Sequence, residues 1–404
     1  MPARTILVIG TLDTKGAEIA YVRALIEARG HIPLILDAGV TEPPWQADVD
    51  ASRVAAAGGG DVEILRAAGD RATALDVMCR GARAVALELL AAGRIDGVLG
   101  LGGSGGTAIA TAAMTALPVG LPKVMVSTMA SGDVSSYVDV KDVTMMYSVV
   151  DIAGLNRLSR RILANAAGAV CGMVEQALPP VEDRPLVAAT MFGVTTPCVT
   201  RIRESLEASG YEVLVFHATG SGGRAMEALI EDGFVVGVAD ITTTEWCDEV
   251  IGGVLSAGPE RLEAAGRAGI PQVVSVGALD MCNWGPIDTV PEPFRERNLY
   301  RHNPSVTLMR TTPQENAEVG RKIATKLNEA TGPTALFLPL RGVSMIDAEG
   351  GPFWSPEADA ALFEAIRATV DRSRVELVEL DLHVNDPAFA DAMAARLLEM
   401  LASR

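Results

Sequence analysis

The chain has 404 residues, of which 49% are hydrophobic and 4% aromatic, and its formal net charge is −17 at pH 7. This length predicts two or three domains, and the aliphatic composition is typical of parallel sheets buried between helices. The negative charge argues against broad binding to nucleic acid or to an anionic membrane, but it allows a local nucleotide site built from backbone amides and a metal ion.

The first half of the chain alternates short apolar runs with stretches of helical spacing. Apolar residues from Ile19 to Ile26 recur as in an amphipathic helix, and Gly30 is placed to end it. The strands predicted in this half are residues 5–9, 32–36, 97–101 and 123–127, with another that ends at 148. Such alternation predicts a parallel sheet with right-handed crossovers.

The second half repeats this design, and its glycine-rich turn at 220–224 echoes the turn at 103–107. The strands predicted here are residues 186–191, 211–216, 234–239, 272–276, 335–338 and 375–380. We therefore predict an α/β fold of two Rossmann-like, doubly wound domains with mainly parallel sheets. Prolines and charges at 178–185 indicate the boundary, so the predicted domains are residues 1–180 and 185–404.

Ligands of open parallel sheets bind beyond the carboxyl ends of the strands. Residues 102–107 follow a predicted strand and open a helix, where glycines let the backbone approach an anion and the helix dipole favours negative charge. The turn is neither a Walker motif nor G-x-G-x-x-G, so a phosphate site and a simple tight turn both remain open.

Two more loops of the first domain should reach the same edge. Lys15 is suited to pair with phosphate, and Asp13 to hold a metal ion or a hydroxyl, although a helix cap is an alternative role for Asp13. The candidate cofactor-binding residues are Thr11, Asp13, Thr14, Lys15, Gly102, Gly103, Ser104, Gly105, Gly106, Thr107, Ser127, Thr128, Ser131, Gly132 and Asp151.

Polar side chains also follow the strands of the second domain, and a long proline-rich loop at 284–304 carries several arginines. The candidate general acids and bases are His217, Asp240, Glu245 and His383. For the histidines, a structural imidazole is the alternative. The candidate substrate-binding residues are Thr219, Arg224, Thr242, Thr243, Asp280, Asn283, His302 and Arg310. No side chains are singled out as ligands of a resident metal.

The five cysteines are scattered and include no C-x-x-C pair, so neither disulfides nor a zinc site is expected. No charged and apolar leader precedes the first predicted strand, and no apolar run reaches the ~18 residues of a membrane span. These features predict a cytoplasmic protein.

Several longer stretches are more specific than any generic motif. They are residues 10–15, 100–107 (GLGGSGGT), 122–124, 130–132, 148–152 (SVVDI), 190–199 (TMFGVTTPCV), 214–220 (LVFHATG), 222–227 (GGRAME), 240–245 (DITTTE), 275–281 (SVGALDM), 308–312 (LMRTT) and 342–344. In these stretches, which run along nearly the whole chain, the sequence resembles the family of the tomato mosaic virus resistance protein and its bacterial and fungal relatives.

The resemblance implies two Rossmann-like domains, ATP bound in the first of them, and a homodimer. It assigns the ATP site to the loops at 10–15, 102–107 and 127–133. The plant member blocks viral RNA replication by binding the viral replication protein. That role is not carried over to this chain, because surface stretches such as residues 40–61 show no match.

Two functions fit these observations. The first is an ATP-dependent enzyme with ATP and Mg²⁺ on the first domain and a small anionic metabolite on the second. The second is a nucleotide sensor whose domain or dimer arrangement is set by ATP. A dehydrogenase is disfavoured because the first strand lacks G-x-G-x-x-G and Asp37 only partly matches a ribose-binding acid.

Overall fold

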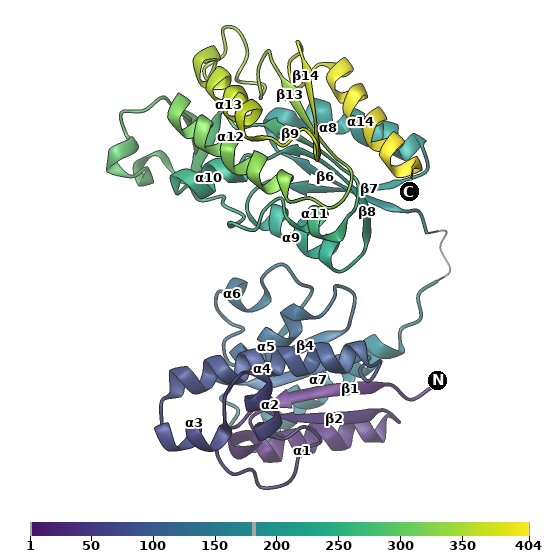
Figure 1. The fold of residues 1–404 in the computed structure, drawn as a ribbon. Helices are drawn as coiled ribbons and strands as arrows, with labels where there is room; N and C mark the ends of the chain where they lie inside the picture. Colours follow the sequence, from purple (N-terminus) through teal and green to yellow (C-terminus); the bar gives the residue numbers. More distant parts are fainter. Residues whose placement is uncertain (1, 180–182, 404) are drawn as a thin grey trace. The chain divides into compact units, whose positions relative to one another are not determined.

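The computed structural model describes residues 2–179 and 183–403. The chain forms two compact units, Met1–Pro180 and Val181–Arg404, and each has its own parallel sheet covered by helices (Figure 1). The α/β fold predicted from the sequence is confirmed. The predicted linker at 178–185 includes residues 180–182, which lie outside the described residues.

The N-terminal domain has five strands. They are β1 (Thr5–Gly10), β2 (Ile32–Asp37), β3 (Gly97–Gly102), β4 (Lys123–Ser127) and β5 (Thr144–Tyr147). The helices are α1 (Leu12–Ala28), α2 (Ala51–Ala57), α3 (Val62–Ala68), α4 (Arg71–Ala91), α5 (Ser104–Ala116), α6 (Ser135–Val138) and α7 (Arg157–Glu175). All strand pairs are parallel, in the order β2-β1-β3-β4-β5.

Alternate residues of the N-terminal strands feed two separate cores. Leu7 and Ile9 of β1 pack in the core that α4 and α5 cover, whereas Ile6 and Val8 pack in the core of α1 and α7. Helices therefore cover both faces of the sheet, as in doubly wound folds. The strand order reverses between β1 and β3, so the loops after these two strands diverge and leave a crevice at the carboxyl edge.

The C-terminal domain follows the same plan with one more strand. Its parallel strands are β6 (Leu186–Met191), β7 (Glu212–His217), β8 (Val235–Thr242), β9 (Gln272–Gly277), β13 (Thr334–Pro339) and β14 (Val375–Leu380). The sheet order is β14-β13-β9-β8-β6-β7. The helices are α8 (Thr196–Ala208), α9 (Ser221–Glu231), α10 (Glu245–Ile251), α11 (Ala264–Ala268), α12 (Pro313–Asn328), α13 (Pro356–Thr369) and α14 (Pro387–Ala402), with short 3-10 turns at Gly193–Thr195, Ile287–Thr289 and Glu292–Phe294.

The prediction of one long loop at 284–304 is wrong in part. β10 (Met281–Trp284), β11 (Leu299–Asn303) and β12 (Val306–Arg310) form a small antiparallel sheet in the order β10-β12-β11. A tight turn joins β11 to β12, where the N–H of Ser305 donates to the side-chain oxygen of Asn303 at 2.8 Å. The segment is thus anchored on the domain by strand pairing.

Two further expectations concern the whole chain. All five cysteines are free thiols. Within residues 2–179 and 183–403, no helix is both long enough and apolar enough to cross a bilayer.

Candidate functional site

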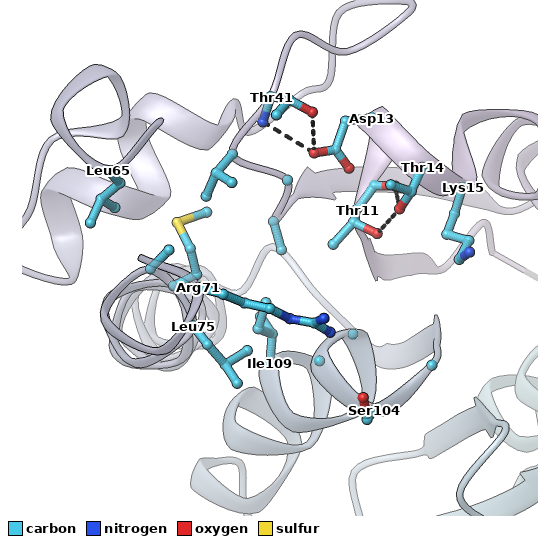
Figure 2. A pocket seen from close by; sticks show the side chains of 18 of the residues that line it. Thr11, Asp13, Thr14, Lys15, Thr41, Leu65, Arg71, Leu75, Ser104 and Ile109 are labelled. Atoms are coloured by element: carbon cyan, nitrogen blue, oxygen red, sulfur yellow. Dashed lines mark hydrogen bonds between the residues drawn. The ribbon is translucent and has the colours of Figure 1, made fainter. Parts of the chain in front are cut away.

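The crevice between β1 and β3 opens into a cavity of about 690 Å³. The loops after both strands line it, as the topology of the sheet predicts. Its third wall comes from the crossover between β2 and β3, namely α3 and the start of α4 (Figure 2). This volume is in the range of small-molecule and cofactor sites.

The glycine turn forms the floor of this cavity. Gly103, Ser104, Gly105 and Gly106 all line it at the start of α5. Among the described residues, no acceptor is bonded to the N–H groups of Gly103 and Gly106. Several unsatisfied amides at the N-terminus of a 13-residue helix form a site suited to an anion.

Buried hydroxyls support the turn from below. The side chains of Thr107 and Ser127 are buried, and their oxygens lie 2.6 Å apart. Ser127 also accepts a hydrogen bond from the N–H of Met129 at 2.9 Å. This contact ties the helix of the glycine turn to the end of β4, so it fixes the position of the turn without facing the cavity.

The loop after β1 supplies polar groups at one side of the cavity. Asp13 accepts hydrogen bonds through Oδ2 from the N–H and the hydroxyl of Thr41, at 3.1 and 2.7 Å. Its Oδ1 is shielded from solvent and has no hydrogen-bond partner among the described residues. The first N–H of α1, that of Leu12, donates to the carboxylate of Asp37 at 2.9 Å, so the alternative of Asp13 as the helix cap is not what the structure shows. Its free oxygen is suited to a metal ion or a ligand hydroxyl.

Lys15 and Arg71 approach the glycine turn from opposite walls (Figure 2). No hydrogen bond or ion pair to either side chain is found within the described part of the chain. Arg71 begins α4, and its Nη2 would lie 3.7 Å from a Cβ placed on Gly105. The chain is strongly acidic, yet two cations flank this turn.

Much of the remaining cavity wall is apolar, although Thr41, Arg66 and Asp70 also line it. The apolar members come from the loop after β2, from α3, α4 and α5, and from the loop after β4; they are Val40, Leu65, Ala74, Leu75, Met78, Ile109 and Met129. An apolar wall opposite a polar floor suits a ligand with a flat apolar part and an anionic part. The sequence analysis missed this wall and Arg71, because crossover helices carry no strand-end signal.

A strained turn leads to the last polar residue of the cavity. Val149 has a φ of 63°, which a β-branched residue rarely adopts. The N–H of Val150 donates to the carbonyl of Ser148 at 2.7 Å, as in a γ-turn. Asp151 follows and lines the cavity. Strain of this kind occurs where a site constrains the backbone.

The candidate cofactor-binding residues divide into three groups by position. Those that line the cavity are Thr11, Asp13, Thr14, Lys15, Gly103, Ser104, Gly105, Gly106, Thr128 and Asp151. Gly102, Thr107 and Ser127 lie directly beneath it, and Gly102 packs so closely on the next turn that an added Cβ would be 2.6 Å from the Cα of Gly106. Ser131 and Gly132 belong to the exposed loop after β4.

The corresponding crevice of the C-terminal domain, between β6 and β8, is filled by its own side chains. The hydroxyls of Thr195 and Thr242 lie 2.7 Å apart, and Thr190 donates to Asp240 at 2.6 Å. Thr243 is also buried, and its hydroxyl donates to the carbonyl of Ser275 at 3.0 Å. The crevice that is open in the first domain is thus closed by hydrogen bonds in the second.

A carboxylate occupies the glycine turn of the C-terminal domain. Oε1 of Glu245 accepts the N–H groups of Gly220 and Gly223, at 2.7 and 3.1 Å. In both turns the first glycine's carbonyl accepts the N–H of the residue four positions later, which is Thr107 for Gly103 and Arg224 for Gly220. The two glycines differ in backbone conformation, with a φ of −79° at Gly103 and 83° at Gly220. The chain therefore contains one example of such a turn binding an anion.

Glu245 and Asp240, two of the candidate catalytic residues, are buried and share one cation. Arg261 is also buried, and it pairs with Glu245 at 2.7 Å, with Asp240 at 2.6 Å and with Glu227 at 3.2 Å. Burial is the main cause that raises the pKa of Glu227. This four-residue network ties β8, α9 and α10 together.

Arg310 and Asp280, two candidate substrate-binding residues, belong to a second buried network. Arg310 pairs with Asp359 at 2.7 Å and lies 3.5 Å from Asp347, while Asp280 accepts the hydroxyl of Ser344 at 2.7 Å. Burial, and then repulsion from Asp347, raise the pKa values of Asp280 and Asp359. One guanidinium faces three carboxyl groups here, so bound protons, besides Arg310, neutralise part of the carboxyl charge.

Asn283, another candidate of the same set, donates to the buried carboxylate of Asp248 at 2.7 Å. Burial raises the pKa of Asp248 to about 7. His383 accepts the N–H of Asn385 through Nδ1 at 3.1 Å, while its Nε2 lies 2.9 Å from the carbonyl of Ser344. Through these contacts the imidazole joins two loops.

The remaining candidates lie at the surface of the C-terminal domain. His217 is exposed at the end of β7 and stacks on Phe192, with 5.3 Å between ring centroids. Thr219 donates to the carbonyl of His217 at 3.2 Å. Arg224 is exposed at the start of α9, and His302 is exposed on β11. The candidates of this domain thus do not form one cluster.

Both domains match models of one protein family. The N-terminal domain model of the Uncharacterised protein family (UPF0261) matches residues 4–179, and the C-terminal domain model of that family matches residues 184–401. The "UPF0261 protein" of Clostridium tetani is 55% identical over 400 residues, which are 98% of this chain and 99% of that protein.

The plant relative is also found. The "ToMV resistance protein Tm-1(GCR237)" of Solanum lycopersicum is 46% identical over 313 residues, which are 76% of this chain and 42% of that protein. Among solved structures, a putative UDP-N-acetylglucosamine 2-epimerase from Listeria monocytogenes is 11% identical and covers 98% of this chain and 95% of its own, with a TM-score of 0.22.

Proposed function

This chain belongs to the Uncharacterised protein family (UPF0261), and from the cavity of its N-terminal domain we propose that it binds ATP there. The observation that carries the proposal is the joining of three features in one cavity of about 690 Å³: the amides of the glycine turn, two cations and an apolar wall. The phosphates lie on the turn, and the adenine lies against the wall.

The binding of the Glu245 carboxylate by backbone amides supports the proposed position of the phosphates. In the C-terminal domain, the amides of the similar turn hold an internal anion, and Arg261 neutralises it. In the N-terminal domain the turn faces the cavity, and Lys15 and Arg71 flank it. An external anion takes the place that a side chain takes in the other turn.

ATP is the nucleotide that the family resemblance implies, and Mg²⁺ accompanies it. The free Oδ1 of Asp13 fits the ion, because protein sites for Mg²⁺ usually offer one or two carboxylates and leave the other positions to water and phosphate. Asp151 lines the same cavity as a second carboxylate. The ion neutralises phosphate charge next to these acids.

For the use of ATP we propose an enzyme acting on a small anionic metabolite that contacts the C-terminal domain. The exposed His217 and Arg224 and the partly exposed Thr219 are better placed for this than Asp240 and Glu245. Those two carboxylates are buried and pair with Arg261. Turnover of ATP that depends on a metabolite supports this proposal. Saturable binding without turnover, across a broad metabolite panel, favours a nucleotide sensor instead.

Calorimetric titration of the full chain with ATP, with and without Mg²⁺, tests the binding proposal. We expect saturable heat from one site per chain, reduced by removal of Mg²⁺, and competition from both inorganic triphosphate and adenosine because each fills one half of the cavity. Absence of heat well above micromolar protein contradicts the proposal. The homodimer that the resemblance implies is a separate proposal, for which sedimentation is the test.

A further inference from the structure

We infer that Arg71 binds the phosphate chain of the nucleotide and gives the cavity its preference for nucleoside triphosphates over monophosphates. This inference rests on the proposed function. It assigns a specificity-determining role to a residue outside the strand-end loops, on the crossover between β2 and β3.

Arg71 is positioned within reach of the glycine turn. Its side chain leaves the first residue of α4 and crosses the cavity toward the glycine turn (Figure 2). A Cβ placed on Gly105 would lie 3.7 Å from Nη2 of Arg71 and 3.8 Å from Cδ1 of Leu75. The guanidinium thus stands beside the unsatisfied amides, where a phosphate on the turn would be within reach.

The guanidinium of Arg71 differs from the other charged groups nearby in its hydrogen bonding. Arg66 lines the same cavity, but it donates to the carbonyl of Val40 at 2.8 Å and to the carboxylate of Glu63 at 3.0 Å. The neighbouring Asp70 is also engaged, because its carboxylate accepts the N–H of Ala72 at the start of α4. Within the described residues, no acceptor holds Arg71. A planar fork of donors without a protein partner suits two oxygens of a phosphate chain.

The two cations of the cavity are separated across its width. Lys15 and Arg71 stand on opposite walls, so one phosphate on the turn cannot use both cations as well as a chain of phosphates can. Each added phosphate brings charge and acceptors to the fork. We therefore expect affinity to rise steeply from AMP to ATP, and Arg71 to supply much of that rise.

Binding of ATP, ADP and AMP to the wild-type chain, Arg71→Met and Arg83→Met tests this inference by calorimetry. Arg83 is an exposed residue of the same helix outside the lining of the cavity, so its variant matches the change in net charge. Arg71→Met should weaken ATP binding by about tenfold to a hundredfold, the usual effect of losing charge-assisted hydrogen bonds. It should change AMP binding by less than about threefold on the same reasoning, and Arg83→Met should match the wild type.

Equal losses for ATP and AMP in Arg71→Met, or no loss for either, would overturn the inference while leaving ATP binding intact. If the wild-type chain binds none of the three nucleotides, the proposed function fails and this inference with it. Arg71 is exposed, so its variant should unfold at the wild-type temperature, and a thermal melt distinguishes lost recognition from lost structure.

Discussion

The carboxylate of Glu245 lies 3.1 Å from the backbone nitrogen of Gly223, and it fills the turn so closely that a Cβ on Gly223 would be 2.3 Å from Oε2. This contact explains why two similar glycine turns have different roles in one chain. The C-terminal turn joins α9 to α10 through a buried carboxylate, while the N-terminal turn remains open to a ligand.

Loss of Arg261 should destabilise the C-terminal domain more than loss of Glu245. Arg261→Met leaves three carboxylates without their cation, and we expect a cost of about 3–5 kcal/mol in the free energy of unfolding. Glu245→Gln keeps an acceptor for the amides and should cost about 1–3 kcal/mol. Urea unfolding followed by the fluorescence of the buried Trp246 measures both; equal costs would show that Arg261 does not hold this network.

Stability of the C-terminal domain should fall as the pH rises from about 5 to 8. In the folded state, burial raises the pKa values of Asp280 and Asp359, and brings that of Asp248 to about 7, from the ordinary 3.8. A raised pKa in the folded state means that the folded protein binds the proton more tightly than the unfolded chain does. The resulting stabilisation is complete below about pH 4 and is lost as the pH rises through the folded-state pKa.

Asp280→Asn tests this dependence, because it removes one titrating carboxyl and its repulsion from Asp347. The decrease in unfolding free energy between pH 5 and 8 should be smaller in this variant than in the wild type. The substitution Asp288→Asn, at an exposed position, provides the control. An unchanged pH slope in Asp280→Asn would contradict the assignment of the proton to this network.

The hydrogen bond between Thr107 and Ser127 should couple the glycine turn to β4. We expect Thr107→Val and Ser127→Ala each to cost about 1 kcal/mol of unfolding free energy in the N-terminal domain. The double variant should cost less than the sum, by about 1 kcal/mol, because both remove the same bond. Strict additivity in this cycle would show that the two hydroxyls act separately.

Much of the N-terminal site could be predicted from sequence, for a topological reason. Lys15 and Gly105 follow strands, and the carboxyl ends of parallel strands meet at one edge of the sheet. Arg71 and Leu75 could not be found in this way. They begin a crossover helix, and only its packing over the sheet brings them to the turn.

The same rule was less informative in the C-terminal domain. Asp240 and Glu245 follow β8 and were therefore candidates for acid or base chemistry, yet both meet Arg261, which lies 21 and 16 residues further along the chain. Sequence position does not reveal such pairing, and it does not separate a buried carboxylate from one that faces a ligand. The antiparallel strand β11 was missed because LYRHN shows no clear alternation of apolar residues.

The most direct test of the account is calorimetric titration of ATP into the wild-type chain, Gly105→Val and Gly172→Val. A Cβ at Gly105 meets only ordinary contacts, so the fold should persist while the larger side chain covers the amides. Gly172 lies in α7, has open space around it and is not in the cavity lining. We predict saturable binding by the wild type and Gly172→Val and none by Gly105→Val. Wild-type affinity in Gly105→Val would contradict the glycine turn as the phosphate site.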